Sequence, residues 1–238
     1  MEKMRLNRYL SLCGIASRRK ADDIIKSGEI KVNNILITEP GLSIELGKDI
    51  VKYKNKIIKA KKYEYFIFNK PRGYVCSKGN ESMRGNVYEL LPGKLKHLKY
   101  VGRLDINTEG LLMFTNDGEL IEKLTHPRHG VTRVYAMLLK YDLSPNNILK
   151  FKHGIKHENE FYKFTDIFKL KETKAGPYYI LKLKEGKNRE IRNSVKLFNN
   201  KIFWLKRIEF GPIKLGELKL GQYRPLTNSE IRELKKLL

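Results

Sequence analysis

Residues 99–118 constrain the fold most strongly, because they read as two apolar strands joined by a polar loop. Residues 99–101 form the first strand, and residues 111–114 form the second, which ends at an Asn-Asp-Gly turn. The loop between them presents Arg103 and Asp105, and such a loop lies at the edge of a sheet, where functional side chains are concentrated. Taken alone, Asp105 is better explained by turn chemistry, since aspartate favours turns by hydrogen bonding to its own backbone.

The charge of the chain indicates an acidic partner. Its 238 residues include 49 Lys and Arg against 26 Asp and Glu, a formal net charge of +23 at pH 7. Residues 1–60 carry 13 basic and 7 acidic side chains and the remainder carries 36 and 19, so both parts are basic. Nucleic acid is the first candidate for the partner. An anionic membrane is the second, but we expect no membrane binding, because the sequence has neither a membrane-spanning apolar run nor a long basic amphipathic helix.

The first 60 residues predict a compact unit of two helices followed by a hairpin. Residues 4–12 place their apolar side chains on one helical face, and Ser17 is a good N-cap for the second helix. Two short apolar strands follow, separated by an Asn-Asn turn at residues 33–34.

The first turn of the second helix carries three cations, Arg18, Arg19 and Lys20. Cations at this end oppose the helix dipole, each by roughly 0.3–1 kcal/mol at a surface. A bound phosphate would reverse that effect, since the free backbone N–H groups and the three cations would all face it. The alternative interpretation is a solvated cluster of charges with no ligand.

The remainder of the chain reads as apolar strands alternating with short helices. The predicted strands are 65–68, 133–139, 178–183 and 202–210. Two cations, Lys206 and Arg207, interrupt the last of them. Residues 69–73 form a Pro-Gly turn, residues 185–192 form a basic loop that opens a helix, and Ser229 is a predicted N-cap for the terminal helix.

Several kinds of site are excluded by spacing. Cys13 and Cys76 lie far apart without metal-ligand spacing, so we expect two reduced cysteines in the cytoplasm. His126 and His129 are three residues apart, but no third metal ligand accompanies them. No glycine loop of a nucleotide-binding kind is present, so neither ATP nor a dinucleotide is indicated.

What remains is a loop carboxylate, several basic loops and aromatic residues on strands. A carboxylate can act as a covalent nucleophile if it is ionised, and a nearby guanidinium favours the ionised form. Arg103 and Arg192 are candidates for that guanidinium. A uridine inside structured RNA must leave the base stack before it reacts, and Tyr135 could then lie against the flipped base.

Residues 4–10, 17–22 and 28–33 together resemble the alpha-L RNA-binding motif, the small domain first described in a protein of the small ribosomal subunit. The resemblance covers about residues 4–50 and implies binding to structured RNA through the basic helix face. The contacts that it implies are Arg5, Arg18, Arg19, Lys20 and Lys31.

Four further segments resemble, in order, the motifs of ribosomal RNA pseudouridine synthases of the RsuA and RluB type. They are residues 69–73, residues 102–118, the strand of Tyr135 and residues 185–192. In that family an alpha-L domain precedes the catalytic domain, as it does here. The resemblance therefore covers nearly the whole chain.

The resemblance implies an α+β fold in two domains. Residues 1–60 would form an alpha-L type RNA-binding domain with a basic linker. Residues 61–238 would form the catalytic domain, a mixed, mostly antiparallel sheet with flanking helices. The implied activity is isomerisation of a specific uridine to pseudouridine in ribosomal RNA during ribosome maturation, with no cofactor and no metal. We expect a cytoplasmic monomer that acts on 23S rather than 16S RNA.

The resemblance also implies roles for single residues. Asp105 would be the nucleophile, Tyr135 would pack on the target base and help to remove its C5 proton, and Arg192 would pair with Asp105. Arg103 would fill the space left by the flipped base, and Leu205 would lie beneath the active site. Further RNA contacts are expected from Lys70, Arg72, Lys187 and Arg189. Whether Asp105 adds to the sugar, adds to C6 of the base or promotes a glycal stays open.

Two other classes of function also stay open. A non-catalytic RNA-binding or ribosome-assembly factor could keep the same fold, but the presence of Asp105, Tyr135 and Arg192 argues against it. A tRNA or mRNA modifier would differ only in substrate, and the N-terminal domain argues for ribosomal RNA over tRNA. Asn193 and the pair at residues 199–200 stand where the family often has arginine and glycine, which affects the expected contacts with RNA.

Overall fold

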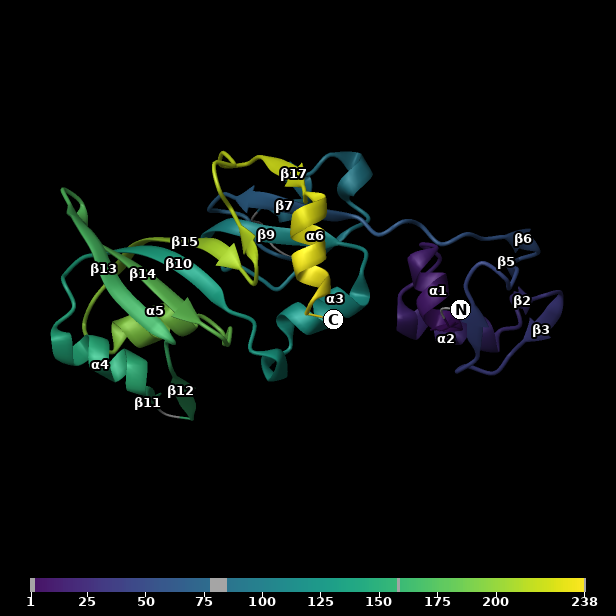
Figure 1. Cartoon of the computed structure of the whole chain (residues 1–238), viewed down its shortest axis with the longest axis horizontal. Coiled ribbons are helices and arrows are strands. Elements are labelled where there is room, and N and C mark those ends of the chain that lie inside the picture. Colours follow the sequence, from purple (N-terminus) through teal and green to yellow (C-terminus); the bar gives the residue numbers. More distant parts are fainter. Residues whose placement is uncertain (1–2, 78–84, 158, 238) are drawn as a thin grey trace. The chain divides into compact units, whose positions relative to one another are not determined.

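The structure is a computed structural model that describes residues 3–77, 85–157 and 159–237 (Figure 1). The chain divides into two compact units, Met1–Tyr63 and Glu64–Leu238, and each has its own hydrophobic core. Within the described ranges, every helix is too short or too polar to traverse a lipid bilayer.

The first unit packs two helices against a small antiparallel sheet. Its elements are β1 (Lys3–Arg5), α1 (Leu6–Leu12), α2 (Arg18–Lys26), β2 (Ile30–Val32), β3 (Ile35–Ile37), β4 (Ser43–Glu45), β5 (Val51–Tyr53) and β6 (Lys56–Ile57). Strands β3, β2, β5 and β6 form one sheet in that order, and β1 pairs with β4. The fully buried side chains of this core include Leu6, Leu10, Ile25 and Ile30.

Local signals in the first unit are confirmed. The Oγ of Ser17 accepts a hydrogen bond from the backbone N–H of Lys20 at 3.4 Å and so caps α2. Asn33 and Asn34 have φ angles of 49° and 69°, the left-handed conformations that a two-residue hairpin turn requires. Strand β1 was not predicted, because three residues are too few to show an alternating pattern.

The second unit is built on a nine-stranded sheet. Its strands are β7 (Tyr65–Lys70), β8 (Lys99–Val101), β9 (Glu109–Thr115), β10 (Arg133–Leu139), β13 (Asp166–Thr173), β14 (Gly176–Leu183), β15 (Ile202–Phe210), β16 (Ile213–Lys214) and β17 (Tyr223–Pro225). The order is β13-β14-β10-β15-β9-β7-β17, with β16 beside β15 and β8 beside β9. The β9–β15 pair is parallel and the other described pairs are antiparallel, which confirms the predicted α+β fold with a mixed, mostly antiparallel sheet.

Helices and a separate hairpin flank this sheet. They are α3 (Gly118–Thr125), α4 (Pro145–His153), α5 (Glu190–Lys196), α6 (Asn228–Lys235), the short 3-10 helices η1 (Val87–Leu90), η2 (Gly93–Leu95) and η3 (Pro127–His129), and the hairpin β11 (Ile155–His157) with β12 (Glu160–Tyr162). Helix α4 was not predicted, since it buries only Phe151 and so shows little apolar periodicity. The N-cap predicted at Ser229 is wrong: Thr227 caps α6, because its side chain and that of Glu230 satisfy each other's backbone N–H groups.

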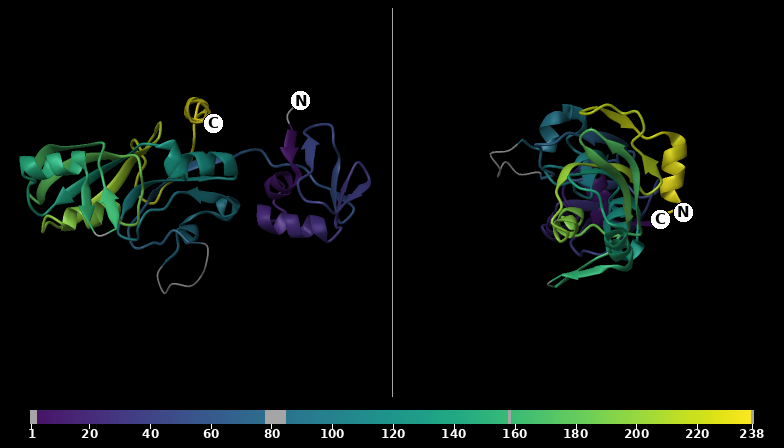
Figure 2. Two further views of the ribbon diagram at one scale, coloured as in Figure 1. Left: turned by 90° about the horizontal axis from the view of Figure 1, so that it is seen from below. Right: turned by 90° about the vertical axis from the view of Figure 1, so that its left-hand side faces the viewer.

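The two faces of the nine-stranded sheet are buried to different extents. Alternate residues of β14 are buried, and Tyr179 and Leu181 join Phe151 of α4 and Val195 of α5 in one core. In the right-hand view of Figure 2, α5 and α6 lie on either side of the strands. The remaining residues of β14 point to the other face, where they are only half-buried. The cavity described next opens on the face that α5 covers.

Candidate active site

A cavity of about 660 Å³ lies in the second unit, between the β8–β9 loop, strands β10, β14 and β15, and the loop that leads into α5. Seven of the residues predicted from the sequence line it: Arg103, Asp105, Tyr135, Lys187, Arg189, Arg192 and Leu205. They come from segments up to about a hundred residues apart in the chain, so the fold, not the local sequence, brings them together.

Asp105 lies in the β8–β9 loop with its carboxylate facing the cavity. Its backbone carbonyl accepts a hydrogen bond from the N–H of Thr108 at 2.9 Å, which closes a turn. Gly102, with φ of 67°, allows the chain to leave β8 in the left-handed conformation. The side chain of Asp105 is 35% exposed, so a substrate can reach it.

Lys70 holds this loop from beneath. Its side chain is fully buried at the end of β7, and its Nζ donates to the carbonyl oxygens of Asp105 at 3.2 Å and Thr108 at 3.0 Å. It also donates to the carbonyl oxygens of Pro71 and Ile106. Burial lowers the pKa of the Lys70 ammonium, and the charge of Asp105 opposes that effect. The prediction that Lys70 contacts RNA is therefore wrong, because no part of the side chain reaches solvent.

Arg192 projects from α5 toward the same loop. Its Nη2 donates to the carbonyl oxygen of Asn107 at 2.8 Å and reaches Oγ1 of Thr108 at 3.4 Å. Its Nε lies 3.9 Å from Oδ2 of Asp105 and, within the described part of the chain, has no hydrogen-bond partner. Burial lowers the pKa of the Arg192 guanidinium, while Asp105 raises it. The guanidinium is thus anchored to the loop backbone and presents its Nε toward the carboxylate.

Tyr135 and Leu205 form the apolar part of the cavity. Tyr135 is 8% exposed and Leu205 is 2% exposed, and they come from the adjacent strands β10 and β15. An aromatic ring and a branched aliphatic side chain beside one carboxylate suit a planar, partly apolar ligand such as a nucleobase.

Two buried arginines beneath the cavity were not predicted as site residues. Arg207 on β15 is 1% exposed, donates from Nε to the carbonyl oxygen of Leu111 at 2.8 Å, and leaves Nη2 without a partner among the described atoms. Arg133 on β10 is 7% exposed and donates to the carbonyl oxygens of Val131, Lys184 and Leu124. The sequence signal was the interruption of an apolar strand at Arg207, which does not by itself reveal burial.

The remaining predicted cations occupy the rim or lie outside it. Arg103 and Arg189 are exposed at the rim, and Lys187 donates to the carbonyl oxygen of Phe161 at 2.6 Å. Arg72 does not line the cavity: its Nε lies 3.1 Å from Oε1 of Glu109. Among the described residues that line the cavity, basic side chains therefore outnumber the carboxylates of Asp105 and the buried Glu190.

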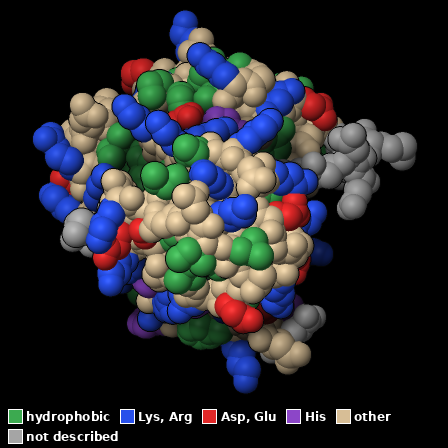
Figure 3. Space-filling view, turned by 90° about the vertical axis from the view of Figure 1, so that its right-hand side faces the viewer, with side chains coloured by type: hydrophobic (Ala, Val, Ile, Leu, Met, Phe, Trp, Pro, Cys, Tyr) green, Lys and Arg blue, Asp and Glu red, His purple; other side chains and the backbone are tan. Residues whose placement is uncertain are grey.

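In the first unit, the predicted RNA contacts lie at its surface. Arg5, Arg18, Arg19 and Lys20 are exposed, and Lys31 is half-buried on β2. Figure 3 shows Lys and Arg side chains spread across the face that it displays, with Asp and Glu at fewer places. In the part of the chain that the structure describes, no group of three His, Cys, Asp or Glu side chains is placed to hold a metal ion.

Comparisons with known proteins agree with one another. A family model described as RNA pseudouridylate synthase matches residues 64–197, and an S4 domain model matches residues 4–50. A relative from Aquifex aeolicus (strain VF5), called an uncharacterized RNA pseudouridine synthase, is 35% identical over 237 residues, which cover 99% of this chain and 95% of the relative. Ribosomal large subunit pseudouridine synthase B of Bacillus subtilis (strain 168) is 32% identical over 239 residues, which cover 98% and 96%.

A solved structure is also similar to this chain. It is titled as the crystal structure of pseudouridylate synthase and is 27% identical to this chain, with a TM-score of 0.66. The similarity covers 97% of this chain and 99% of the solved one, so it includes both units.

Proposed function

Because the chain belongs to the RNA pseudouridine synthase family, we propose that it isomerises a specific uridine of ribosomal RNA and that Asp105 is the nucleophile. The observation that carries this proposal is the meeting of Asp105, Tyr135 and Arg192 at one cavity. The cavity volume lies in the range of small-ligand sites and accommodates a flipped nucleoside.

The reaction exchanges one bond of the nucleoside for another. The bond between N1 and C1′ breaks, the freed uracil turns, and a bond forms between C5 and C1′. C5 loses its proton and N1 gains one, so atoms and charge balance without a cofactor. Addition to C1′, addition to C6 and the glycal route all start from an ionised Asp105.

The surrounding residues have separate tasks in this proposal. Arg192 pairs with Asp105 and directs its carboxylate, as the 3.9 Å approach of Nε supports. Tyr135 lies against the base and helps to remove the C5 proton, and Leu205 closes the apolar side of the pocket. Together they prevent the freed uracil from diffusing away while it turns. Arg103, at the rim, fills the space that the uridine leaves in the RNA.

The substrate we propose is large-subunit ribosomal RNA, bound by a monomer in the cytoplasm during ribosome maturation. The name of the Bacillus subtilis relative, ribosomal large subunit pseudouridine synthase B, supports the choice of subunit. The S4 domain match and the exposed cations of α2 support a role of the first unit in RNA binding, with the second unit carrying the catalytic site.

Release of tritium from RNA labelled at C5 of uridine tests this function, because formation of the bond between C5 and C1′ displaces that atom. The enzyme is incubated separately with large-subunit and small-subunit ribosomal RNA transcripts. We expect release from the large-subunit RNA. Release from the small-subunit RNA alone would overturn the subunit assignment, and release from neither would overturn the proposed activity.

Replacing Arg192 by alanine should lower kcat by about 10²-fold or more, the scale of a lost charge-stabilising donor at an active site. Its effect on the free energy of unfolding should be only about 1 kcal/mol, because the Asp105 partner is 35% exposed and solvent screens the pair. Tritium release and thermal unfolding measure the two effects. The conservative variant Arg192→Lys keeps the charge but not the Nε geometry, and full activity in that variant would contradict the directing role.

Replacing Arg18, Arg19 and Lys20 together by alanine should flatten the salt dependence of RNA binding. Each lost phosphate contact on a duplex removes about 0.9 from the slope of log affinity against log salt, so a decrease of about 2 to 3 is expected. The control replaces two exposed cations, Lys235 at the end of α6 and Lys236 directly after it, and the loss of slope is compared per cation removed. If both variants lost the same salt slope per cation, the cations of α2 would contribute no more to RNA binding than other surface cations do.

A further inference from the structure

The face of the sheet opposite the cavity carries an aromatic and basic strip that the proposed active site does not use. We call Lys171, Tyr178, Trp204 and Arg72 the β15 strip. Tyr178 and Trp204 both pair in register with Leu138 of β10, and their rings stack at 5.8 Å with an interplanar angle of 30°. Both rings are half-buried, and neither belongs to the core under α4 and α5.

A cationic side chain lies at each end of the strip. The ammonium of Lys171 lies 5.8 Å above the ring of Tyr178. At the other end, Nη2 of Arg72 donates to the carbonyl oxygen of Phe203 at 3.0 Å, and the ring of Phe203 is 42% exposed.

The carboxylate in the middle of the strip is already neutralised. Glu109 accepts from Nε1 of Trp204 at 2.9 Å and pairs with Arg72 at 3.1 Å. Among the described residues, Lys171 and Lys206 of this face have no ion-pair partner. The strip therefore offers aromatic surface with an excess of positive charge.

The strip is continuous with the active-site loop. Strand β15 pairs with β9 only from Lys206 onward, so Phe203 and Trp204 extend past the start of β9 and lie at the end of the sheet where Asp105 lies. The loop of Arg72 contacts the Asp105 loop, because the N–H of Gly73 donates to the carbonyl oxygen of Ile106 at 2.9 Å. The Arg72 loop thus contacts the Asp105 loop through Gly73, and Arg72 reaches Trp204 through Glu109.

We propose that the β15 strip binds single-stranded nucleotides of the RNA that flank the target uridine. Stacked aromatic rings with unpaired cations are the surface that single-stranded RNA recognises, since every base has a π-face and every nucleotide a phosphate. An uncharged apolar partner would gain nothing from the lysines. The inference rests on the RNA substrate of the proposed function and extends its binding site beyond the cavity.

The chain offers a direct probe, because Trp204 is its only tryptophan. A short single-stranded RNA of mixed sequence, titrated into the full-length enzyme, should quench the tryptophan fluorescence as a base stacks on the indole. If the Trp204 fluorescence changed with protein concentration and not with added RNA, the β15 strip would be a contact with a second copy of the chain. That result would overturn the proposal.

Replacing Trp204 by leucine should raise KM for labelled large-subunit ribosomal RNA about tenfold, the effect of one lost base stack, with kcat unchanged. Trp204→Phe keeps a ring and should retain most of the affinity, which separates stacking from a folding defect. If Trp204→Leu keeps the parental KM and still releases tritium, the proposal that the strip binds RNA is wrong, and the proposed function is unaffected. Failure of the proposed function has a different signature, since the parental enzyme would then release no tritium.

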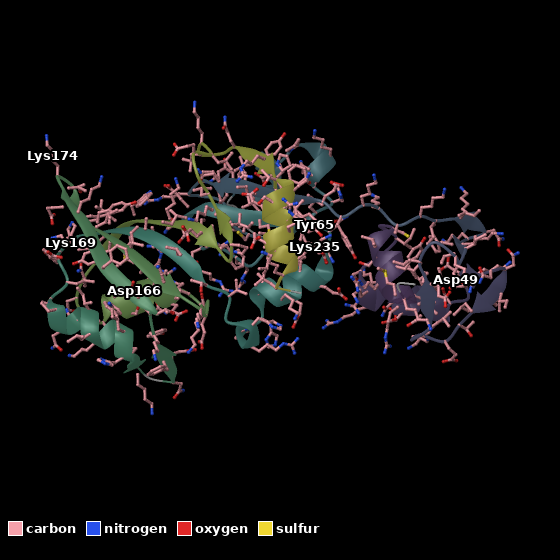
Figure 4. All side chains as sticks on the ribbon, in the orientation of Figure 1. Asp49, Tyr65, Asp166, Lys169, Lys174 and Lys235 are labelled. Atoms are coloured by element: carbon pink, nitrogen blue, oxygen red, sulfur yellow. The ribbon has the colours of Figure 1, made fainter. Side chains whose placement is uncertain are left out.

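A lysine pair supplies the matched charge control. Figure 4 labels Lys174, which lies in the turn between β13 and β14. Lys171→Ala should reduce the salt slope for single-stranded RNA by about 0.7, and Lys174→Ala should leave it unchanged. Equal salt slopes for Lys171→Ala and Lys174→Ala would mean that Lys171 does not contact a phosphate of the RNA.

Discussion

Replacing Asp105 by asparagine is expected to abolish tritium release while leaving the affinity for RNA nearly unchanged. The change is almost isosteric and removes only the charge, so the turn that carries the side chain should persist. Loss of a nucleophile costs about four orders of magnitude or more in kcat. The affinity should survive, because it comes from the basic surfaces of both units and not from one carboxylate.

The matched control is Asp166→Asn, a half-buried carboxylate on β13 that pairs with Lys152 at 2.9 Å; Figure 4 labels Asp166. It should keep parental activity. If Asp105→Asn lost RNA binding in proportion to activity, the carboxylate would be a structural element of the binding surface and not the nucleophile.

Replacing Lys70 by methionine is expected to have the largest effect on stability. Methionine fills a similar volume but donates no hydrogen bond, so the carbonyl oxygens of Pro71, Asp105 and Thr108 lose their donor in a buried place. Each stranded buried polar group costs about 1–3 kcal/mol, and a total of about 3 kcal/mol or more would lower Tm by roughly 6–12 °C in a unit of this size. The desolvation cost of the ammonium is regained and offsets part of the loss.

The same change should also lower kcat, because the Asp105 loop loses its support. Lys96→Met replaces an exposed lysine of the same unit and should alter neither Tm nor kcat. Differential scanning calorimetry and tritium release measure the two effects. A parental Tm in Lys70→Met would mean that the loop holds its conformation without the buried ammonium.

Sequence patterns predicted those features that are encoded locally. The cap at Ser17, the turn at Asn33 and Asn34, and strand β15 over Ile202–Phe210 each follow from a few adjacent residues, and the structure has all of them. Short or weakly periodic elements were missed, as β1 and α4 were, because propensity alone does not specify them.

Burial was the property that the sequence did not reveal. Lys70 was predicted to contact RNA, and Arg207 was predicted only to interrupt a strand. Both are buried, and the backbone carbonyls that accept hydrogen bonds from them come from segments distant in the chain. Their positions depend on tertiary contacts, which composition and spacing do not contain. The residues gathered at the cavity were named through a resemblance, while the two buried arginines beneath it became evident only in three dimensions.

The hydrogen bonds that hold the Asp105 loop join segments that lie far apart in the sequence. Lys70 reaches the loop across 35 to 38 positions of sequence, and Arg192 reaches Asn107 across 85. Contacts of such separation form late, because a long loop must close before they contribute. The core that holds the basic helix of the first unit is built from residues 4–58, which are synthesised before the residues of the cavity. A newly made chain can therefore hold RNA before it can modify it, and catalytic competence marks the completion of the fold.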